Sequence, residues 1–296
     1  MVRLTIFESI TYYGLNTFSF FVRLFDRKIS IIFGKVIGLI IYFIIPIRKK
    51  VAKLNLTIAF PKKSENEINQ IIKECYQHFG IVMMDLLRTK NLNKKNIQSI
   101  VEIEPSDLKL LMKESGGIII TGHIGSWEMM LPIFGINKLP FSVVVQFQRN
   151  KGAQKFFNEI RQFNGSKTIL KGIKSSLLLN EISKGKFLGL ASDQNAGKKG
   201  VMVQFFGKET SIPKGAAIFK MKSKAPLFFC YCVSVNDNRY KLFVDKLDIN
   251  LGQIEPENKV EEICKLIALD LENIVRKYPE QYFWFHRKWP KKIYKN

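Results

Sequence analysis

The amino-acid sequence predicts an α/β fold, with a mostly parallel central sheet flanked by helices and an N-terminal helical segment that associates with a membrane. Short apolar runs typical of buried strands alternate with amphipathic helical stretches from about residue 99 onward. The 296 residues are 46% hydrophobic, which is enough for one large core. The first 47 residues hold much of the apolar excess, although the chain carries a formal net charge of +22.

Two apolar stretches begin the chain. Residues 6–25 are aromatic and amphipathic, as in a helix that lies in a membrane interface. Residues 29–47 contain one charged residue, Lys35, and their length is at the short end of what a bilayer-spanning helix requires. Basic residues follow directly after Pro46. The sequence therefore predicts a membrane-associating segment over residues 1–50, either spanning or interfacial, and one globular domain over residues 51–296.

Within the domain, helices and strands are expected to alternate. A helix begins near Ser64, after a turn at Pro61, because apolar residues from there to Arg88 repeat at helical spacing. Strands are expected over residues 99–104, 116–121, 140–148, 166–170, 186–194, 225–237 and 239–248. Helices are expected over residues 106–115, from Trp127, and over 151–163, 174–185, 212–224 and 258–279. Strands that alternate with helices indicate a largely parallel sheet.

The four cysteines are Cys75, Cys230, Cys232 and Cys264, and they show no C-x-x-C spacing. Cys230 and Cys232 lie two apart in a β-like run, so they are expected on one face of a strand. This pattern is typical of buried thiols in a reducing compartment. Neither a metal site nor a cofactor is expected.

The stretch GGIIITGHIGSWEMM (residues 116–130) holds the candidate catalytic group. His123, one of three histidines, follows the end of a predicted strand in a Gly-bounded loop, where open α/β sheets bind ligands. Glu128 lies five positions later, in the first turn of the next helix, and could bind Nδ1–H of His123, leaving Nε2 free to accept a proton. That turn also offers free backbone N–H groups for developing negative charge. The alternative is a structural histidine that caps the helix.

Five blocks of sequence resemble one known family. They are NLTIAFP (residues 55–61), the H-x4-E pattern of GHIGSWE (122–128), the segment VVVQFQRN with Arg149, ASDQNAGKKGVMVQFFGKETSIPKGAA (191–217), and YPEQYFWFHRKW (278–289). In this order they resemble the bacterial late acyltransferases of lipid A biosynthesis, within the superfamily of glycerolipid acyltransferases. The resemblance implies the α/β fold of those enzymes and a catalytic domain over residues 51–296.

The resemblance also implies roles for individual residues. His123 would be the general base and Glu128 its orienting partner. Arg149 would bind an anionic substrate group or stabilise the oxyanion, and Asp193 would position a sugar hydroxyl or a lysine. Three residues of the last block, Glu280, His286 and Arg287, are expected to form a structural ion-pair cluster.

The charge distribution suggests the partners. Residues 149–224 carry sixteen Lys and Arg side chains against four acidic ones, a surplus of twelve. A basic surface suits an acidic acyl carrier protein and a phosphorylated glycolipid, and equally an anionic membrane. The resemblance implies an acyl-carrier-protein thioester, or acyl-CoA, as donor, an anionic glycolipid as acceptor, and a location on the cytoplasmic face of the inner membrane.

Three alternatives remain at the level of sequence. A related acyltransferase could act on a mannoside, an ornithine lipid or glycerol phosphate. A basic nucleic-acid-binding protein is disfavoured, because the N-terminus is apolar and no binding module is recognisable, so no nucleic-acid partner is expected. In a catalytically inactive membrane scaffold, His123 and Glu128 would be incidental.

Overall fold

The expected α/β architecture with a mostly parallel sheet is present in the computed structural model, which describes residues 4–236, 238–250, 252 and 254–294. Asp237, the last residue of the expected strand 225–237, lies outside the described residues. Over the described part, seven strands form one sheet in the order β1-β9-β8-β2-β5-β3-β4. The β8–β9 pair is antiparallel, and the other neighbours are parallel. The bounds are β1 Val101–Glu102, β2 Gly117–Thr121, β3 Phe141–Val145, β4 Lys167–Leu170, β5 Phe187–Ala191, β8 Leu227–Asn236 and β9 Arg239–Lys246.

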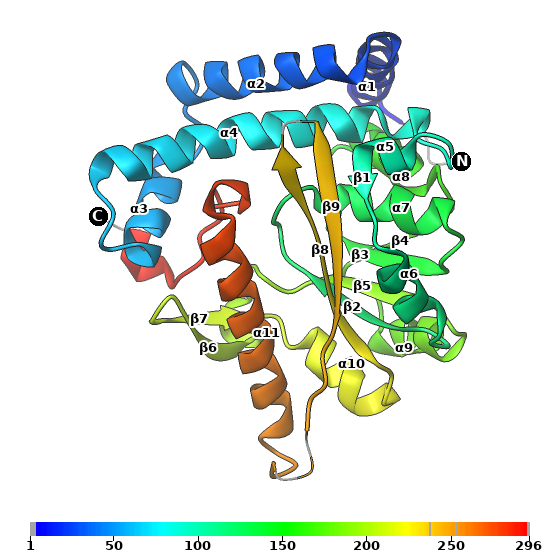
Figure 1. Ribbon diagram of the computed structural model, residues 1–296, viewed down its shortest axis with the longest axis vertical. Coiled ribbons are helices and arrows are strands. Elements are labelled where there is room, and N and C mark those ends of the chain that lie inside the picture. Colours follow the sequence, from blue (N-terminus) through cyan, green and yellow to red (C-terminus); the bar gives the residue numbers. More distant parts are fainter. Residues whose placement is uncertain (1–3, 237, 251, 253, 295–296) are drawn as a thin grey trace.

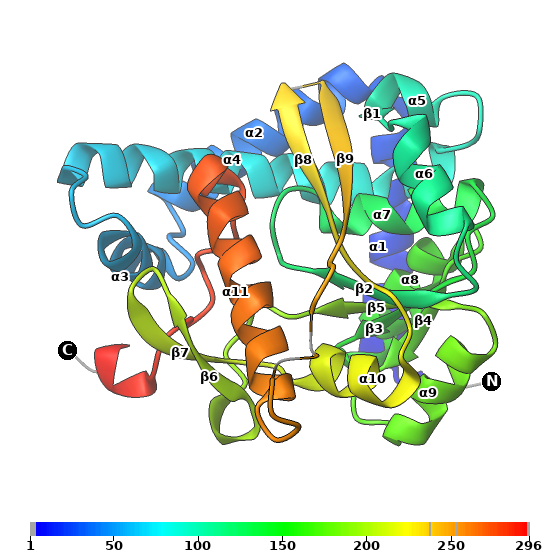
Figure 2. The same ribbon diagram turned by 60° about the horizontal axis from the view of Figure 1, so that its bottom comes forward.

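Helices cover both faces of this sheet (Figures 1 and 2). Ile118 and Ile120 of β2 point into one core with residues of α9, α10 and α11, whereas Ile119 points into a second core with residues of α6 and α7. This alternation is what a strand buried on both faces requires. The helices are α1 Ile6–Leu24, α2 Arg27–Phe43, α3 Lys49–Ala59, α4 Glu65–Leu87, α5 Ile97–Ile100, α6 Pro105–Met112, α7 Met130–Ile136, α8 Lys151–Gln162, α9 Ser175–Ser183, α10 Gly215–Ser223 and α11 Lys259–Lys277.

Two elements lie where the sequence suggested none. The NLTIAFP block forms the end of helix α3 and the turn after it. The block after β5 folds into an antiparallel hairpin of β6 (Val201–Phe205) and β7 (Lys208–Ile212). Its turn residues Phe206 and Gly207 both have positive φ, the geometry of a tight two-residue hairpin turn. The expected burial of Cys230 and Cys232 is confirmed, since both are reduced and lie in the same core.

The N-terminal helices are fastened to the domain by close backbone contact. α2 crosses α4 at Gly34, Gly38 and Gly80, where a Cβ on Gly80 would lie 2.0 Å from the carbonyl oxygen of Gly34. Only glycines permit so close an approach. None of the described helices combines the length and the apolarity that crossing a bilayer would require.

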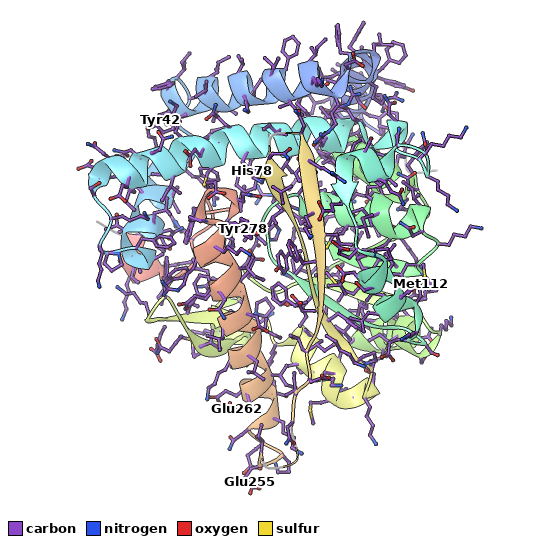
Figure 3. The ribbon with its side chains drawn as sticks, in the orientation of Figure 1. Tyr42, His78, Met112, Glu255, Glu262 and Tyr278 are labelled. Carbon is purple, nitrogen blue, oxygen red and sulfur yellow. The ribbon has the colours of Figure 1, made fainter. Side chains whose placement is uncertain are left out.

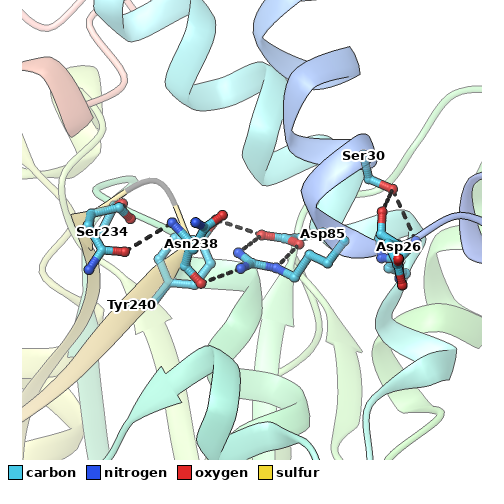
Figure 4. A network of polar contacts seen from close by, with 9 residues as sticks. Asp26, Ser30, Asp85, Ser234, Asn238 and Tyr240 are labelled. Carbon is cyan, nitrogen blue, oxygen red and sulfur yellow. Dashed lines mark hydrogen bonds and ion pairs between the residues drawn. The ribbon is translucent and has the colours of Figure 1, made fainter.

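A polar network also joins α2 to the domain. Arg27 pairs with Asp85 of α4, with Nη2 2.7 Å from Oδ2, and the hydroxyl of Tyr240 donates to the same carboxylate at 2.7 Å (Figure 4). Arg88 donates to the carbonyls of Val22 and Phe25 at the end of α1. The helical pair α1–α2 is therefore attached through both buried charge and packing.

Candidate active site

The sheet brings His123 and Asp193 together. β2 and β5 are parallel neighbours with Thr121 opposite Ala191, so the segments that follow the two strands leave the sheet at the same edge. His123 lies two residues after the end of β2, and Asp193 lies two residues after the end of β5. A Cβ at Gly122 would lie 2.8 Å from Cδ1 of Leu271 and in ordinary contact, at 3.4 Å, with the Cβ of Asp193. This is the carboxyl edge of the sheet, where open α/β folds bind their ligands.

The two side chains form a hydrogen bond of 2.8 Å between Nδ1 of His123 and Oδ1 of Asp193. Burial disfavours the imidazolium, but the carboxylate more than offsets this and raises the pKa of His123. Burial also opposes the charge on Asp193, yet the imidazole lowers the pKa of that carboxyl to about 2. The carboxylate is thus ionised and holds a proton on Nδ1. Among the described residues no side chain or backbone group bonds Nε2, and the imidazole is 24% exposed.

Glu128 does not occupy the place expected from the sequence. Its carboxylate binds Arg161 of α8 through two hydrogen bonds, of 2.9 Å from Nε and 2.5 Å from Nη2. Burial disfavours the guanidinium, but Glu128 raises the pKa of Arg161. Glu128 acts on His123 only as a nearby negative charge. The bend at Gly125 and Ser126 leads the chain into a 3₁₀ turn (η2, Trp127–Met129), so the expected bond to Nδ1 goes to Asp193 instead.

The loop that carries His123 is held between β8 and the C-terminal signature. Gly125 N–H donates to the carbonyl of Gln281, Ser126 N–H to that of Cys232, and Phe283 N–H to that of His123 itself. Gly125 has φ +58, and a Cβ there would lie 2.1 Å from the oxygen of Cys232. Because the first two amides are already bonded, an oxyanion would have to meet amides further into the η2 turn.

Aromatic rings surround the imidazole. Trp127 lies edge-on to His123 with ring centroids 5.0 Å apart, and Phe283 lies 6.3 Å away. Phe79 of α4 contacts both rings. All three rings are only partly buried. His123 therefore lies in an apolar, partly open setting that suits a hydrocarbon chain better than a charged substrate.

Residues of the C-terminal signature complete the site. The ammonium group of Lys288 donates to the main-chain carbonyl of Asp193, and both side chains are buried. Burial, with a contribution from Asp193, raises the pKa of Tyr282 well above its usual value. Sequence reasoning missed Arg161, Tyr282 and Lys288. The basic run HRKW marked the segment as charged, but nothing local distinguished the one buried lysine.

The other predicted site residues lie elsewhere. Arg149 is exposed on the segment between β3 and α8, and over the described residues no hydrogen bond or ion pair joins it to His123 or Asp193. The expected ion-pair cluster is wrong: Glu280, His286 and Arg287 form no ion pair with one another over the described residues.

The two remaining histidines are poor bases. His78 is 8% exposed on α4, between that helix and the body of the domain (Figure 3). Burial lowers its pKa to about 4, and no described group bonds its Nε2. Burial also lowers the pKa of His286. Neither histidine is held by a carboxylate as His123 is, so His123 is the best-placed proton acceptor.

Comparison with known proteins identifies the family. The sequence model for bacterial lipid A biosynthesis acyltransferases matches residues 4–291. The chain is 22% identical over 285 residues to the lipid A biosynthesis palmitoleoyltransferase of Escherichia coli K12, covering 94% of this chain and 90% of the relative, and equally to a lipid A biosynthesis acyltransferase of Shigella flexneri. It is 24% identical over 143 residues, 47% of each chain, to a phosphatidylinositol mannoside acyltransferase of Mycolicibacterium smegmatis. The chain is an acyltransferase and belongs to the bacterial lipid A biosynthesis acyltransferase family.

Proposed function

We propose that this protein transfers a fatty acyl chain from an acyl-carrier-protein thioester to a hydroxyl of a lipid A precursor at the cytoplasmic face of the inner membrane. The observation that carries the proposal is the bond between Nδ1 of His123 and Asp193 in a partly open, aromatic-lined setting. A carboxylate that fixes the tautomer leaves Nε2 as the proton acceptor, the arrangement that general-base catalysis needs.

The reaction follows from that geometry. Nε2 of His123 removes the proton of the acceptor hydroxyl, and the oxygen attacks the thioester carbonyl. The C–S bond then breaks, and the imidazolium returns its proton to the departing thiolate. The products are an ester and a free thiol, without a covalent acyl-enzyme. Asp193 stabilises the imidazolium that forms between the two proton transfers. The ion pair of Glu128 and Arg161 lies near the imidazole and acts on His123 through its charges.

The basic surface supports the choice of partners. The surplus of twelve positive charges over residues 149–224 suits an acidic carrier protein and a phosphorylated acceptor. Arg149, exposed beside the start of α8, is proposed to contact an anionic group of one of these substrates rather than the reacting atoms. The partial similarity to the mannoside acyltransferase makes a mannoside-bearing lipid the second candidate acceptor.

The donor and the acceptor can be tested separately. The purified protein in detergent is incubated with a Kdo-bearing lipid A precursor and either an acyl-carrier-protein thioester or the CoA thioester of the same chain. We expect one added acyl chain by mass spectrometry, formed at least about tenfold faster from the carrier protein, because electrostatic steering raises the encounter rate. Glycolipids of cells lacking the protein should lack one acyl chain. An unchanged glycolipid profile in those cells would exclude a lipid A acceptor.

The apolar face of α1 and α2 supports membrane binding by residues 1–50, with residues 51–296 as the catalytic domain. Large apolar side chains stay exposed along both helices and the turn after them, although the same helices are packed on α4 and α8. The exposed ones are Ile6, Phe7, Ile10, Tyr13, Phe18, Phe20, Phe21, Leu24, Phe25, Ile29, Ile32, Phe33, Val36, Ile40, Phe43, Ile44, Ile45 and Ile47. An exposed apolar patch of this extent marks an interaction surface, and the basic residues after Pro46 suit anionic headgroups.

We expect the triple variant Phe20→Ser, Phe21→Ser and Phe33→Ser to bind anionic phospholipid vesicles at least about 100-fold more weakly. Each phenylalanine that no longer enters the bilayer removes about 1.5 kcal/mol or more of binding free energy. Vesicle co-sedimentation measures the effect.

The matched control replaces Met112, Leu177 and Leu269 with serine. These residues are as exposed as the three phenylalanines, at 53%, 52% and 54%, but lie on the catalytic domain. The control should bind as the wild-type protein does. Equal loss in both triple variants would show that the α1–α2 face is not the membrane-binding surface.

A further inference from the structure

We propose that Lys288 is a positioning residue for the reaction: its buried ammonium group holds Asp193 in place and adds a positive charge beside it, and so controls when His123 is ready to accept a proton. The inference rests on the proposed role of His123 as the base. It concerns a residue of the C-terminal signature that does not touch the imidazole.

The geometry of Lys288 is unusual for a lysine. Its side chain is buried, with 2% of the residue exposed, and Nζ donates to the main-chain carbonyl of Asp193. On another side, Nζ lies 4.1 Å from the centre of the Phe205 ring. No carboxylate of the described residues lies within ion-pair distance of Nζ. Burying an ammonium group without an ion pair is costly, so a purely structural role would be better filled by an apolar side chain.

The backbone of Lys288 is bonded back to the same loop. Its carbonyl oxygen accepts a hydrogen bond of 2.9 Å from Nδ2 of Asn195, two residues after Asp193, and another from the hydroxyl of Thr210 on β7. Lys288 thus donates to the loop through its side chain and accepts from it through its main chain. These reciprocal bonds fix the backbone position of Asp193 after the end of β5. They therefore also fix the direction in which its carboxylate points toward His123.

The carboxylate of Asp193 interacts with positive charge on both Lys288 and a protonated His123. Asp193 lies between the imidazole and the ammonium group and feels the field of both, which lowers its pKa to about 2 against the effect of burial. Burial lowers the pKa of Lys288 to about 8, with Asp193 opposing. The ammonium group repels a proton on His123, so its charge favours the neutral, basic imidazole.

The other titratable groups around Lys288 change charge outside the range of pH 7 to 9. Burial raises the pKa of Tyr282, and of Tyr294 next to Trp289, above their usual values, so both phenols stay neutral. Burial lowers the pKa of His286, which keeps that imidazole neutral. A fall in kcat as the pH rises through about 8 is therefore assigned to Lys288, because loss of the proton from His123 would raise kcat instead.

The test compares Lys288→Met, which keeps the length and removes the charge, with Lys288→Arg, which keeps the charge at every accessible pH. In the wild-type protein we expect kcat to fall as the pH is raised through about 8, after subtraction of the donor hydrolysed without protein. Lys288→Arg should stay within about fivefold of wild-type kcat at pH 7 and lose this alkaline decline. Lys288→Met should lower kcat about 10- to 100-fold, with KM changed less than about threefold.

Lys220→Met is the matched control. Lys220 is also partly buried and donates to a main-chain carbonyl, that of Ala225, at 2.9 Å, but it lies at the end of α10. Its variant should keep the wild-type pH profile. Wild-type kcat and profile in Lys288→Met, or an alkaline decline that persists in Lys288→Arg, would overturn the proposal.

A second readout needs no substrate, so it separates this inference from the proposed function. The imidazole of His123 is titrated by NMR in the full chain in detergent micelles. In Lys288→Met its pKa should rise by about 0.5 to 1 unit where the bond to Asp193 persists, because the repulsion between two cations is lost, and should fall where that bond is lost. In Lys288→Arg and Lys220→Met it should stay within about 0.2 units of the wild-type value. An unchanged titration in Lys288→Met would overturn the proposal even if acyl transfer to lipid A were absent.

Discussion

Replacing His123 with alanine is expected to lower kcat for acyl transfer by about 10³-fold or more, because a positioned general base contributes about 10² to 10⁴ in rate. The loss should be near the upper end, since the change removes the proton acceptor for the hydroxyl and the donor for the departing thiolate together. Initial rates of ester formation measure it. The imidazole is partly exposed, and three backbone hydrogen bonds hold the loop that carries it. The variant should therefore stay folded and membrane bound.

His286→Ala is the control for this experiment. His286 is close enough to His123 to feel its charge, but no carboxylate holds it. Its variant should keep kcat within about fivefold of the wild-type value. Wild-type turnover in His123→Ala, or an equal loss in both variants, would remove His123 from the role of base.

Replacing Asp193 with asparagine is expected to lower kcat by about 10³-fold, whereas Glu128→Gln should cost only about tenfold. In Asp193→Asn the shape is kept, but an amide can stabilise the wrong tautomer of His123 and cannot stabilise the imidazolium. In serine hydrolases the same change costs about 10⁴ in kcat. Glu128 binds Arg161 and influences His123 only through space. Steady-state kinetics of the two variants at one pH separate the two roles.

The pH profile gives a second measure of the same difference. Activity needs the neutral imidazole, so it is lost as pH falls through the pKa of His123, which Asp193 raises. Without that carboxylate the pKa falls, and the acidic decline should move to lower pH in Asp193→Asn while the maximum rate drops. In Glu128→Gln the decline should move less. A loss in Glu128→Gln as large as that in Asp193→Asn would restore the pairing that sequence spacing suggested.

The sequence located the histidine of the candidate site but chose the wrong carboxylate for its hydrogen bond. Apolar runs and Gly-bounded loops are local signals, and they placed His123 and Asp193 at the ends of strands. Spacing along the chain favoured Glu128, five residues from His123. Whether Asp193, seventy residues away, is nearer depends on strand order, and no local pattern reports that β5 pairs directly with β2.

The same reason explains the residues that were missed. Lys288 lies in a run of basic residues that reads as a solvated surface, and only the packing of the C-terminal segment against β6 and β7 buries its ammonium group. Arg161 lies near the end of an amphipathic helix, where a basic residue is favoured by the helix dipole alone. Its bond to Glu128 depends on how α8 is placed against the loop after β2.

By itself, the sequence determined the α/β class, the apolar N-terminus, the family and the loop that carries His123, because each depends on the residue types of short stretches. The tertiary structure decided which carboxylate bonds the imidazole, which lysine is buried and which apolar side chains stay exposed. Those outcomes depend on distances between segments far apart in the chain, and these exist only once the strands have paired.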